Sequence, residues 1–182
     1  MRTRARMGRV AASAAAMALA ATVMAGCADG RGPGIAASVD GTVISAEEVD
    51  EGMALAPFYA QPPNPTAIVT NLIHASILLP VASDNGLGVS DEDAASFLDG
   101  LDAQSIQVDG EYTQPVLDLV RLSLAAEAAN SAPQGQQFFG EVNERLATAD
   151  ITLSPRYGDW DEATAQPVAA ARPWLVSPTP TQ

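Results

Sequence analysis

The chain has 182 residues, of which 47% are hydrophobic, with 22 acidic residues against nine arginines and a formal net charge of −13. This charge excludes nucleic-acid binding by phosphate neutralisation, and it disfavours contact with anionic lipid headgroups. A single cysteine, Cys27, excludes an intramolecular disulfide, so the core alone must hold the fold together.

The first 26 residues have the features of a secretory signal peptide. Four arginines precede an Ala-rich run from Val10 to Ala25, which is too short and too weakly apolar for a stable spanning helix. The run leads into Val23-Met24-Ala25-Gly26-Cys27, which resembles the lipobox of bacterial lipoproteins. The resemblance implies that Cys27 becomes the lipidated N-terminus, on the extracytoplasmic face of the cell membrane. There are two alternatives. The protein could be secreted in the ordinary way with Cys27 as a free thiol, or the leader could stay attached as a signal anchor.

The mature chain is more acidic than the precursor. All 22 acidic residues follow Cys27 and four of the nine arginines precede it, so the formal charge after the leader is −17. This acidity either serves solubility or attracts basic unfolded segments of other polypeptides. Residues 27–35 are expected to form a flexible tether, and residues 36–161 are expected to form one domain.

A hairpin and a capped helix open the predicted domain. Ile35 to Ile44 is typical of two short strands around Asp40-Gly41, since both turn residues tolerate positive φ. Ser45, followed three residues later by Glu48, is typical of a capping box. The strand edge needs a partner, and the best candidate is Ile151-Thr152-Leu153. We therefore predict that the first and last strands pair and close the domain.

Between these strands we predict five helices, at about residues 46–56, 65–84, 91–101, 115–130 and 136–148. The second is the most apolar and should be the core helix, with Pro80 kinking or dividing it. The third is expected to bury Phe97. The fold class is thus mostly α, a five-helix bundle closed by a small β-sheet, followed by a disordered tail over residues 162–182.

Three segments resemble one known family. Ala37 to Val49 looks like the opening of the SurA/PrsA-type N-terminal domain, and Leu72 to Asp93 looks like its following helix and Val-Ser-Asp-Glu restart. Ile151 to Trp160 is similar to the closing strand of actinobacterial members. The resemblance implies a helical chaperone domain that holds unfolded or secreted polypeptides on an apolar surface without catalysis. The alternative is an envelope adaptor or structural lipoprotein that binds one folded partner.

Catalytic chemistry is not expected. Larger members of the family carry a parvulin prolyl isomerase domain, and the corresponding place here is only Ser131 to Gly135, so no isomerase activity is implied. His74 is the only histidine, and no Gly-x-Ser-x-Gly nucleophile motif is present. Asp91-Glu92-Asp93 fit the positive end of a helix better than a calcium loop. We therefore expect no enzyme, cofactor or metal site.

Two groups of side chains are candidates for other roles. Met53, Phe58 and Tyr59 lie beside a Pro-rich loop, and their position makes them candidate contacts for a bound peptide. Tyr157 and Trp160 are interpreted as a structural latch, in which aromatic rings pack across the closed ends of the domain. The alternative is a small recognition site formed by Arg156, Tyr157 and Trp160.

Overall fold

The computed structural model describes residues 32–58, 63–102 and 112–170, apart from the side chains of Phe58 and Asp102. The expected signal peptide, Cys27 and Tyr59 lie outside these residues. The described elements are β1 (Ile35–Val39), β2 (Thr42–Ser45), α1 (Ala46–Gly52), the 3₁₀ helix η1 (Met53–Phe58), α2 (Pro65–Asp84), α3 (Asp91–Asp102), α4 (Gln114–Ser131), α5 (Gly135–Thr148), β3 (Ile151–Leu153), β4 (Asp159–Asp161) and β5 (Gln166–Val168).

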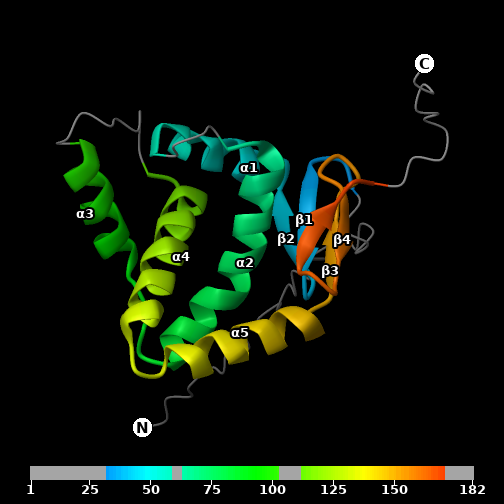
Figure 1. Ribbon diagram of the computed structural model, residues 1–182. Coiled ribbons are helices and arrows are strands. Elements are labelled where there is room, and N and C mark those ends of the chain that lie inside the picture. Colours follow the sequence, from blue (N-terminus) through cyan, green and yellow to red (C-terminus); the bar gives the residue numbers. More distant parts are fainter. Residues whose placement is uncertain (1–31, 59–62, 103–111, 171–182) are drawn as a thin grey trace, which may run out of the picture.

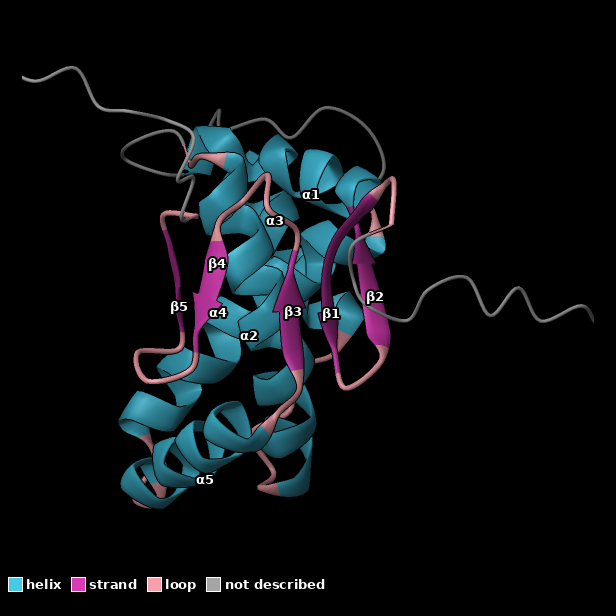
Figure 2. Cartoon of the chain, turned by 90° about the vertical axis from the view of Figure 1, so that its right-hand side faces the viewer, coloured by secondary structure: helices cyan, strands magenta, loops and turns pink. Residues whose placement is uncertain are grey.

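The fold is mostly helical, with two small antiparallel sheets on one side (Figure 1). The view onto the strands shows them side by side in front of the helices (Figure 2). The helix α2 packs against α1, α4, α5 and β1, and it therefore lies at the centre of the domain. The prediction of five helices and a small sheet is confirmed at this level, and the second sheet, β4-β5, was not predicted.

The middle strand of the larger sheet is β1, in the order β2-β1-β3. Ser154 N–H donates to the Ala36 carbonyl at 2.8 Å, and Asp40 N–H donates to the Asp150 carbonyl at 2.9 Å. The register between them is Ala37↔Leu153, Ser38↔Thr152 and Val39↔Ile151. The predicted pairing of residues 151–153 with the first strand is confirmed, although β3 is not the last strand.

The hairpin and cap follow the sequence signals. Asp40 and Gly41 have φ of 49° and 81°, the positive values that a two-residue hairpin turn requires. Ser45 Oγ accepts from Glu48 N–H at 3.1 Å, and Glu48 Oε2 accepts from Ser45 N–H at 2.6 Å. The capping box is therefore confirmed, and it fixes the direction in which α1 leaves β2.

The first helix is shorter than predicted. It ends at Gly52, and the chain tightens into η1, which contains Pro57. Pro57 has no N–H to donate to the carbonyl four residues earlier, so an α-helical ladder cannot continue there. A Cβ on Gly52 would lie 2.7 Å from Ile68 Cγ2 and 2.9 Å from Leu119 Cδ1. Glycine is therefore what allows α1 to lie directly against α2 and α4.

The core helix α2 begins and ends as its sequence predicts. Asn64 Oδ1 accepts from Ala67 N–H at 2.8 Å, and Gly86, with φ of 71°, ends the helix. Pro80 does not divide α2, because the helix continues to Asp84. The alternative, a kink at Pro80, stays a prediction. Pro80 and Ser76 are both exposed, so solvent can satisfy the Ser76 carbonyl that Pro80 leaves without a donor.

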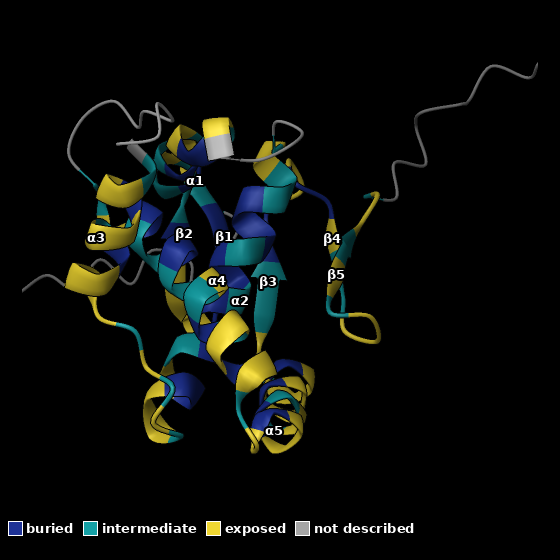
Figure 3. Cartoon of the chain, turned by 60° about the vertical axis from the view of Figure 1, so that its left-hand side comes forward, coloured by how far each residue is buried: buried dark blue, intermediate teal, exposed yellow. Residues whose placement is uncertain are grey.

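The buried residues gather where the helices and the strands face one another (Figure 3). Ile68, Val69, Ile73 and Val81 of α2 and Phe138 of α5 are all fully buried. By length and composition α2 could also cross a membrane, but more than half of it is buried inside the fold, as in an ordinary core helix. Phe97 is 45% exposed, so its predicted burial on α3 is wrong. Ala94 and Leu98 alone fill that face.

The predicted disordered tail is wrong for residues 162–170. The strand β5 pairs with β4 in the register Asp159↔Val168, Trp160↔Pro167 and Asp161↔Gln166. Asp161 forms the turn between them, since its carboxylate accepts from Ala163 N–H at 3.0 Å and from Thr164 Oγ1 at 2.8 Å. Residues 171–182 lie outside the described chain.

Replacing Thr152 by proline should destabilise the whole domain. The flanking hydrogen bonds make Ser38 and Thr152 the hydrogen-bonded pair of the β1-β3 ladder, so proline removes a ladder donor in mid-strand. We expect the free energy of unfolding to fall by about 2 kcal/mol, measured by urea denaturation. Thr152→Ser keeps the N–H and is the control. An equal stability of the two variants would contradict this role of the closure.

Candidate functional site

A cleft of about 420 Å³ lies where β2, α1, α2 and α4 meet. Its walls come from segments that are far apart in the sequence: the second strand, the middle of α2 and the first half of α4. The apolar part of the lining is Val43, Ile44, Leu72, Ala75, Leu79, Pro80 and Pro115. Apolar surface of this kind can receive an apolar side chain from another molecule.

The cleft lies at the outward edge of β2. In β1 the even-numbered residues Ala36, Ser38 and Asp40 bond toward β3, so the odd-numbered ones bond toward β2. Thr42, opposite Val39, and Ile44, opposite Ala37, therefore direct their backbone groups to β1. The backbone N–H and C=O of Val43 therefore point outward in the plane of the sheet, on the side of β2 opposite to β1. The Val43 side chain is 49% exposed.

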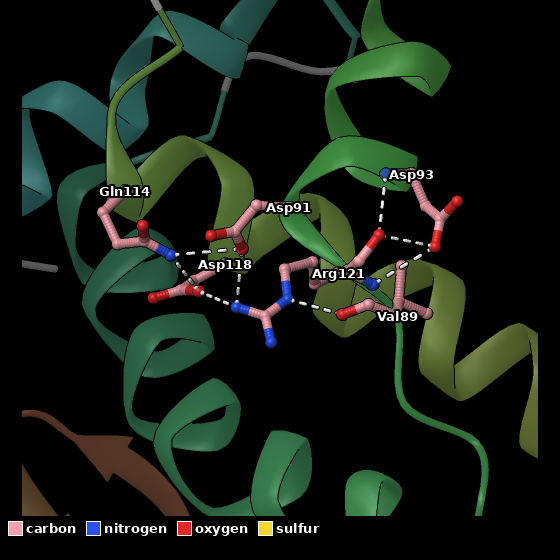
Figure 4. Close-up of polar contacts among 7 residues, drawn as sticks. Val89, Asp91, Asp93, Gln114, Asp118 and Arg121 are labelled. Atoms are coloured by element: carbon pink, nitrogen blue, oxygen red, sulfur yellow. Dashed lines mark hydrogen bonds and ion pairs between the residues drawn. The ribbon is translucent and has the colours of Figure 1, made fainter.

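Gln114, Asp118 and Arg121 form the polar rim of the cleft on the side of α4, and Asp91 is joined to this rim by its ion pair with Arg121. Figure 4 shows these polar contacts. The guanidinium of Arg121 contacts Asp91 and Asp118, each with an N···O distance of 2.9 Å, and its Nε donates to the Val89 carbonyl at 2.8 Å. Gln114 donates to Asp118 at 3.0 Å. These contacts fasten the start of α3 to α4 and hold this wall in place.

The rim carries an excess of negative charge. Two carboxylates, Asp91 and Asp118, share the single positive charge of Arg121. Glu48 on the opposite side adds another carboxylate, of which one oxygen is used by the capping box. The arrangement suits binding by apolar contact and charge. Among the described residues, no group of three side chains could hold a metal ion.

The proposed peptide contacts do not line this cleft. Met53 is half-buried and packs against the core. The side chain of Phe58 and all of Tyr59 lie outside the described residues. The cleft could not have been found from the sequence, because its walls are far apart in the chain and the contact between them depends on the tertiary fold.

The proposed latch residues lie where β3 continues into the second sheet. Tyr157 is buried in the core, its ring is 5.7 Å from the Arg156 guanidinium carbon, and its carbonyl accepts from Thr66 Oγ1 at 3.4 Å. Trp160 packs edge-on against His74 of α2, with ring centroids 6.2 Å apart. These contacts join the C-terminal strands to α2.

His74 also contacts the turn of the β4-β5 hairpin. Its Nε2 lies 3.3 Å from the Ala165 carbonyl oxygen, at a residue with φ of 50°. Burial lowers the pKa of His74 from its usual 6.5, and the hydrogen bond to Ala165 offsets part of that effect. A neutral imidazole packed on α2 therefore helps to hold the hairpin, which is the packing role expected of a lone helical histidine.

The acidic start of α3 is a helix cap. Ser90 Oγ accepts from Asp93 N–H at 3.1 Å and donates to Asp93 Oδ2 at 2.7 Å. The hydrogen bonds from Ser90 lower the pKa of Asp93. The Asp91 carboxylate forms an ion pair with Arg121. The interpretation of these carboxylates as capping residues agrees with these contacts.

Comparison of the chain with protein-family models, curated proteins and solved structures gives no match.

Protonation of His74 should loosen the fold in mildly acidic solution. Because its pKa is lower in the folded chain, the unfolded chain binds the proton first as the pH falls below 6.5. The contribution to stability is therefore full above that pH and declines through the lowered pKa. We expect the melting temperature to fall between about pH 7 and about pH 5.5, and less steeply in His74→Gln. Equal slopes would contradict the assignment.

Proposed function

We propose that this protein is a lipid-anchored, extracytoplasmic chaperone-like protein that holds unfolded or secreted polypeptide segments without catalysis. The observation that carries the proposal is the cleft beside β2, in which apolar side chains lie under an outward strand edge. An extended segment presents both apolar side chains and free backbone groups, and such a cleft offers partners for both. Binding of this kind needs no cofactor.

The SurA-type architecture, without a parvulin domain, is part of this proposal. The pairing of β1 with β3, the capping box at Ser45 and the stop at Gly86 support it, since each falls in a segment that carries the resemblance. Only residues 132–134 lie between α4 and α5, the place of the isomerase domain in larger members. We therefore propose no enzymatic activity.

The anchor belongs to the same proposal. A lipobox ending at Cys27 and an acidic mature chain support attachment through lipid rather than through contact with headgroups. One acyl chain gives only marginal attachment, so stable anchoring needs two or more. The short segment from Cys27 to β1 would keep the domain close to the membrane surface.

The alternative is an envelope adaptor that binds one folded partner. The size of the cleft favours it, because ligand pockets of roughly 300–1,000 Å³ are typical of one defined ligand and this cleft, at about 420 Å³, is near the lower limit. A cleft of that size receives only a few side chains at once. The two functions differ in the range of proteins that are bound: a chaperone-like protein binds many unrelated unfolded proteins, and an adaptor binds one folded partner.

The soluble chain from Ala28 should slow the aggregation of several unrelated unfolded proteins at stoichiometric ratio, measured by light scattering. Leu79→Gln places an amide in the apolar lining and should remove most of this effect. Phe97→Gln, at an exposed position outside the cleft, is the matched control and should behave as wild type. Failure of the wild-type chain on every client, with one folded partner recovered by pull-down, would favour the adaptor.

Lipidation should depend on the single cysteine. In the native host we expect palmitate to label the protein and globomycin to block its processing. Cys27→Ala should abolish the label and release the protein from the membrane fraction, as followed by autoradiography and fractionation. A membrane-bound Cys27→Ala variant would instead indicate a signal anchor.

A further inference from the structure

We propose that the edge of β2 binds an extended segment of positively charged polypeptide as an additional strand. This inference rests on the proposed function and specifies the chemistry of the occupant. Its elements are the outward peptide groups of Val43, the apolar cleft beneath them and the carboxylates on the rim. No residue of the described chain pairs with β2 on this side in the sheet order β2-β1-β3.

The two edges of the three-stranded sheet differ in what covers them. The strand β4 lies next to β3 (Figure 2) and contacts it. The strand β2 faces the cleft instead, through Thr42, Val43 and Ile44. An uncovered strand edge is a template for another chain, and natural proteins usually block it unless it is used. Thr42 and Val43 carry neither charge nor proline, so nothing in these side chains blocks pairing.

The pairing can only be short. Val43 offers one donor and one acceptor, and the next outward donor, Ser45 N–H, is already held by Glu48 at 2.6 Å. Two backbone hydrogen bonds alone give weak binding. The remaining affinity has to come from the side chains of the occupant, with an apolar one placed over Leu72 and Leu79.

Charge complementarity selects the occupant. The lining of the cleft holds the carboxylates of Glu48 and Asp118 and the single cation Arg121. The guanidinium of Arg121 is already engaged by Asp118 and by Asp91, which lies outside the lining. Arg145, elsewhere on the surface, is likewise paired with Asp84 and Glu141. An arginine or lysine in the occupant would therefore meet unneutralised carboxylates, whereas an acidic segment would be repelled.

The same charge disfavours a second copy of this chain as the occupant. Each mature chain carries a formal charge of −17, so two copies joined edge to edge would bring like charges together. Secreted and unfolded polypeptides can carry basic, apolar stretches that have no such penalty. The occupant that fits is an alternating apolar segment flanked by basic residues.

The test uses the full chain in mild detergent and three fluorescent peptides, with binding followed by anisotropy. One peptide alternates valine and threonine between flanking arginines, the second has glutamates as flanks, and the third is the arginine peptide with alternate backbone nitrogens methylated. Val43→Pro removes the outward donor without touching the ladder to β1, and Val43→Thr is its matched control. Glu48→Gln removes one charge while keeping a residue that can form the capping box.

We expect the arginine peptide to bind most tightly. Methylation and Val43→Pro should each weaken it by about tenfold, as for the loss of one hydrogen bond, and Val43→Thr should not. Glu48→Gln should weaken the binding of the arginine peptide by about threefold. It should not weaken the binding of the glutamate peptide, because it removes a like charge from the rim. The methylated peptide tests the edge on unaltered protein, so misfolding of Val43→Pro does not affect the conclusion.

Four results would overturn the inference. The first is equal binding of the arginine peptide and the methylated peptide, with weaker binding of both to Leu79→Gln. This result would contradict the strand pairing and would still agree with the proposed function. Equal binding of the arginine and glutamate peptides would remove the charge selection. A dimer in sedimentation velocity that dissociates in Val43→Pro would assign the edge to a second copy. If no peptide binds and aggregation is also unaffected, both the inference and the proposed function fail.

Discussion

The alternation of peptide groups along β1 is the constraint on which the remaining structure depends. Its even-numbered residues bond to β3 and its odd-numbered residues pair with β2, so one five-residue strand joins segments more than a hundred residues apart. Each side has a separate consequence. The pairing with β3 returns the chain from α5 to its start, and the pairing with β2 turns the free edge of that strand toward α2 and α4.

The helices complete the cleft through a few close contacts. Gly52 lets α1 lie directly against α2 and α4. Arg121 links α4 to the start of α3 through two aspartates and the Val89 carbonyl. Exposed ion pairs contribute little to stability, so the value of this cluster is positional: it fixes where the charges on the rim lie. The contacts that hold the helices together thus also form the cleft.

Local signals in the sequence predict the five helices and the first hairpin. The Asp40-Gly41 turn, the Ser45 cap and the Gly86 stop each depend on a few neighbouring residues, and each is found as predicted. Even the long-range partner of β1 was predictable, because few other segments alternate in the same way. The failures were at Phe97, at the end of the first helix and at the β4-β5 hairpin. Burial at Phe97 and the docking of the hairpin on His74 depend on which elements meet, which no local pattern encodes. The cleft was missed for the same reason.

The central position of β1 also determines how the protein responds to force. A lipid anchor would pull on the chain just before Ile35, where β1 begins. Because β1 is held on both sides, such a pull acts on two ladders at once, along the strand rather than across it. The bonds must then break together instead of opening one by one. A domain tethered in this way should keep its shape under such a pull.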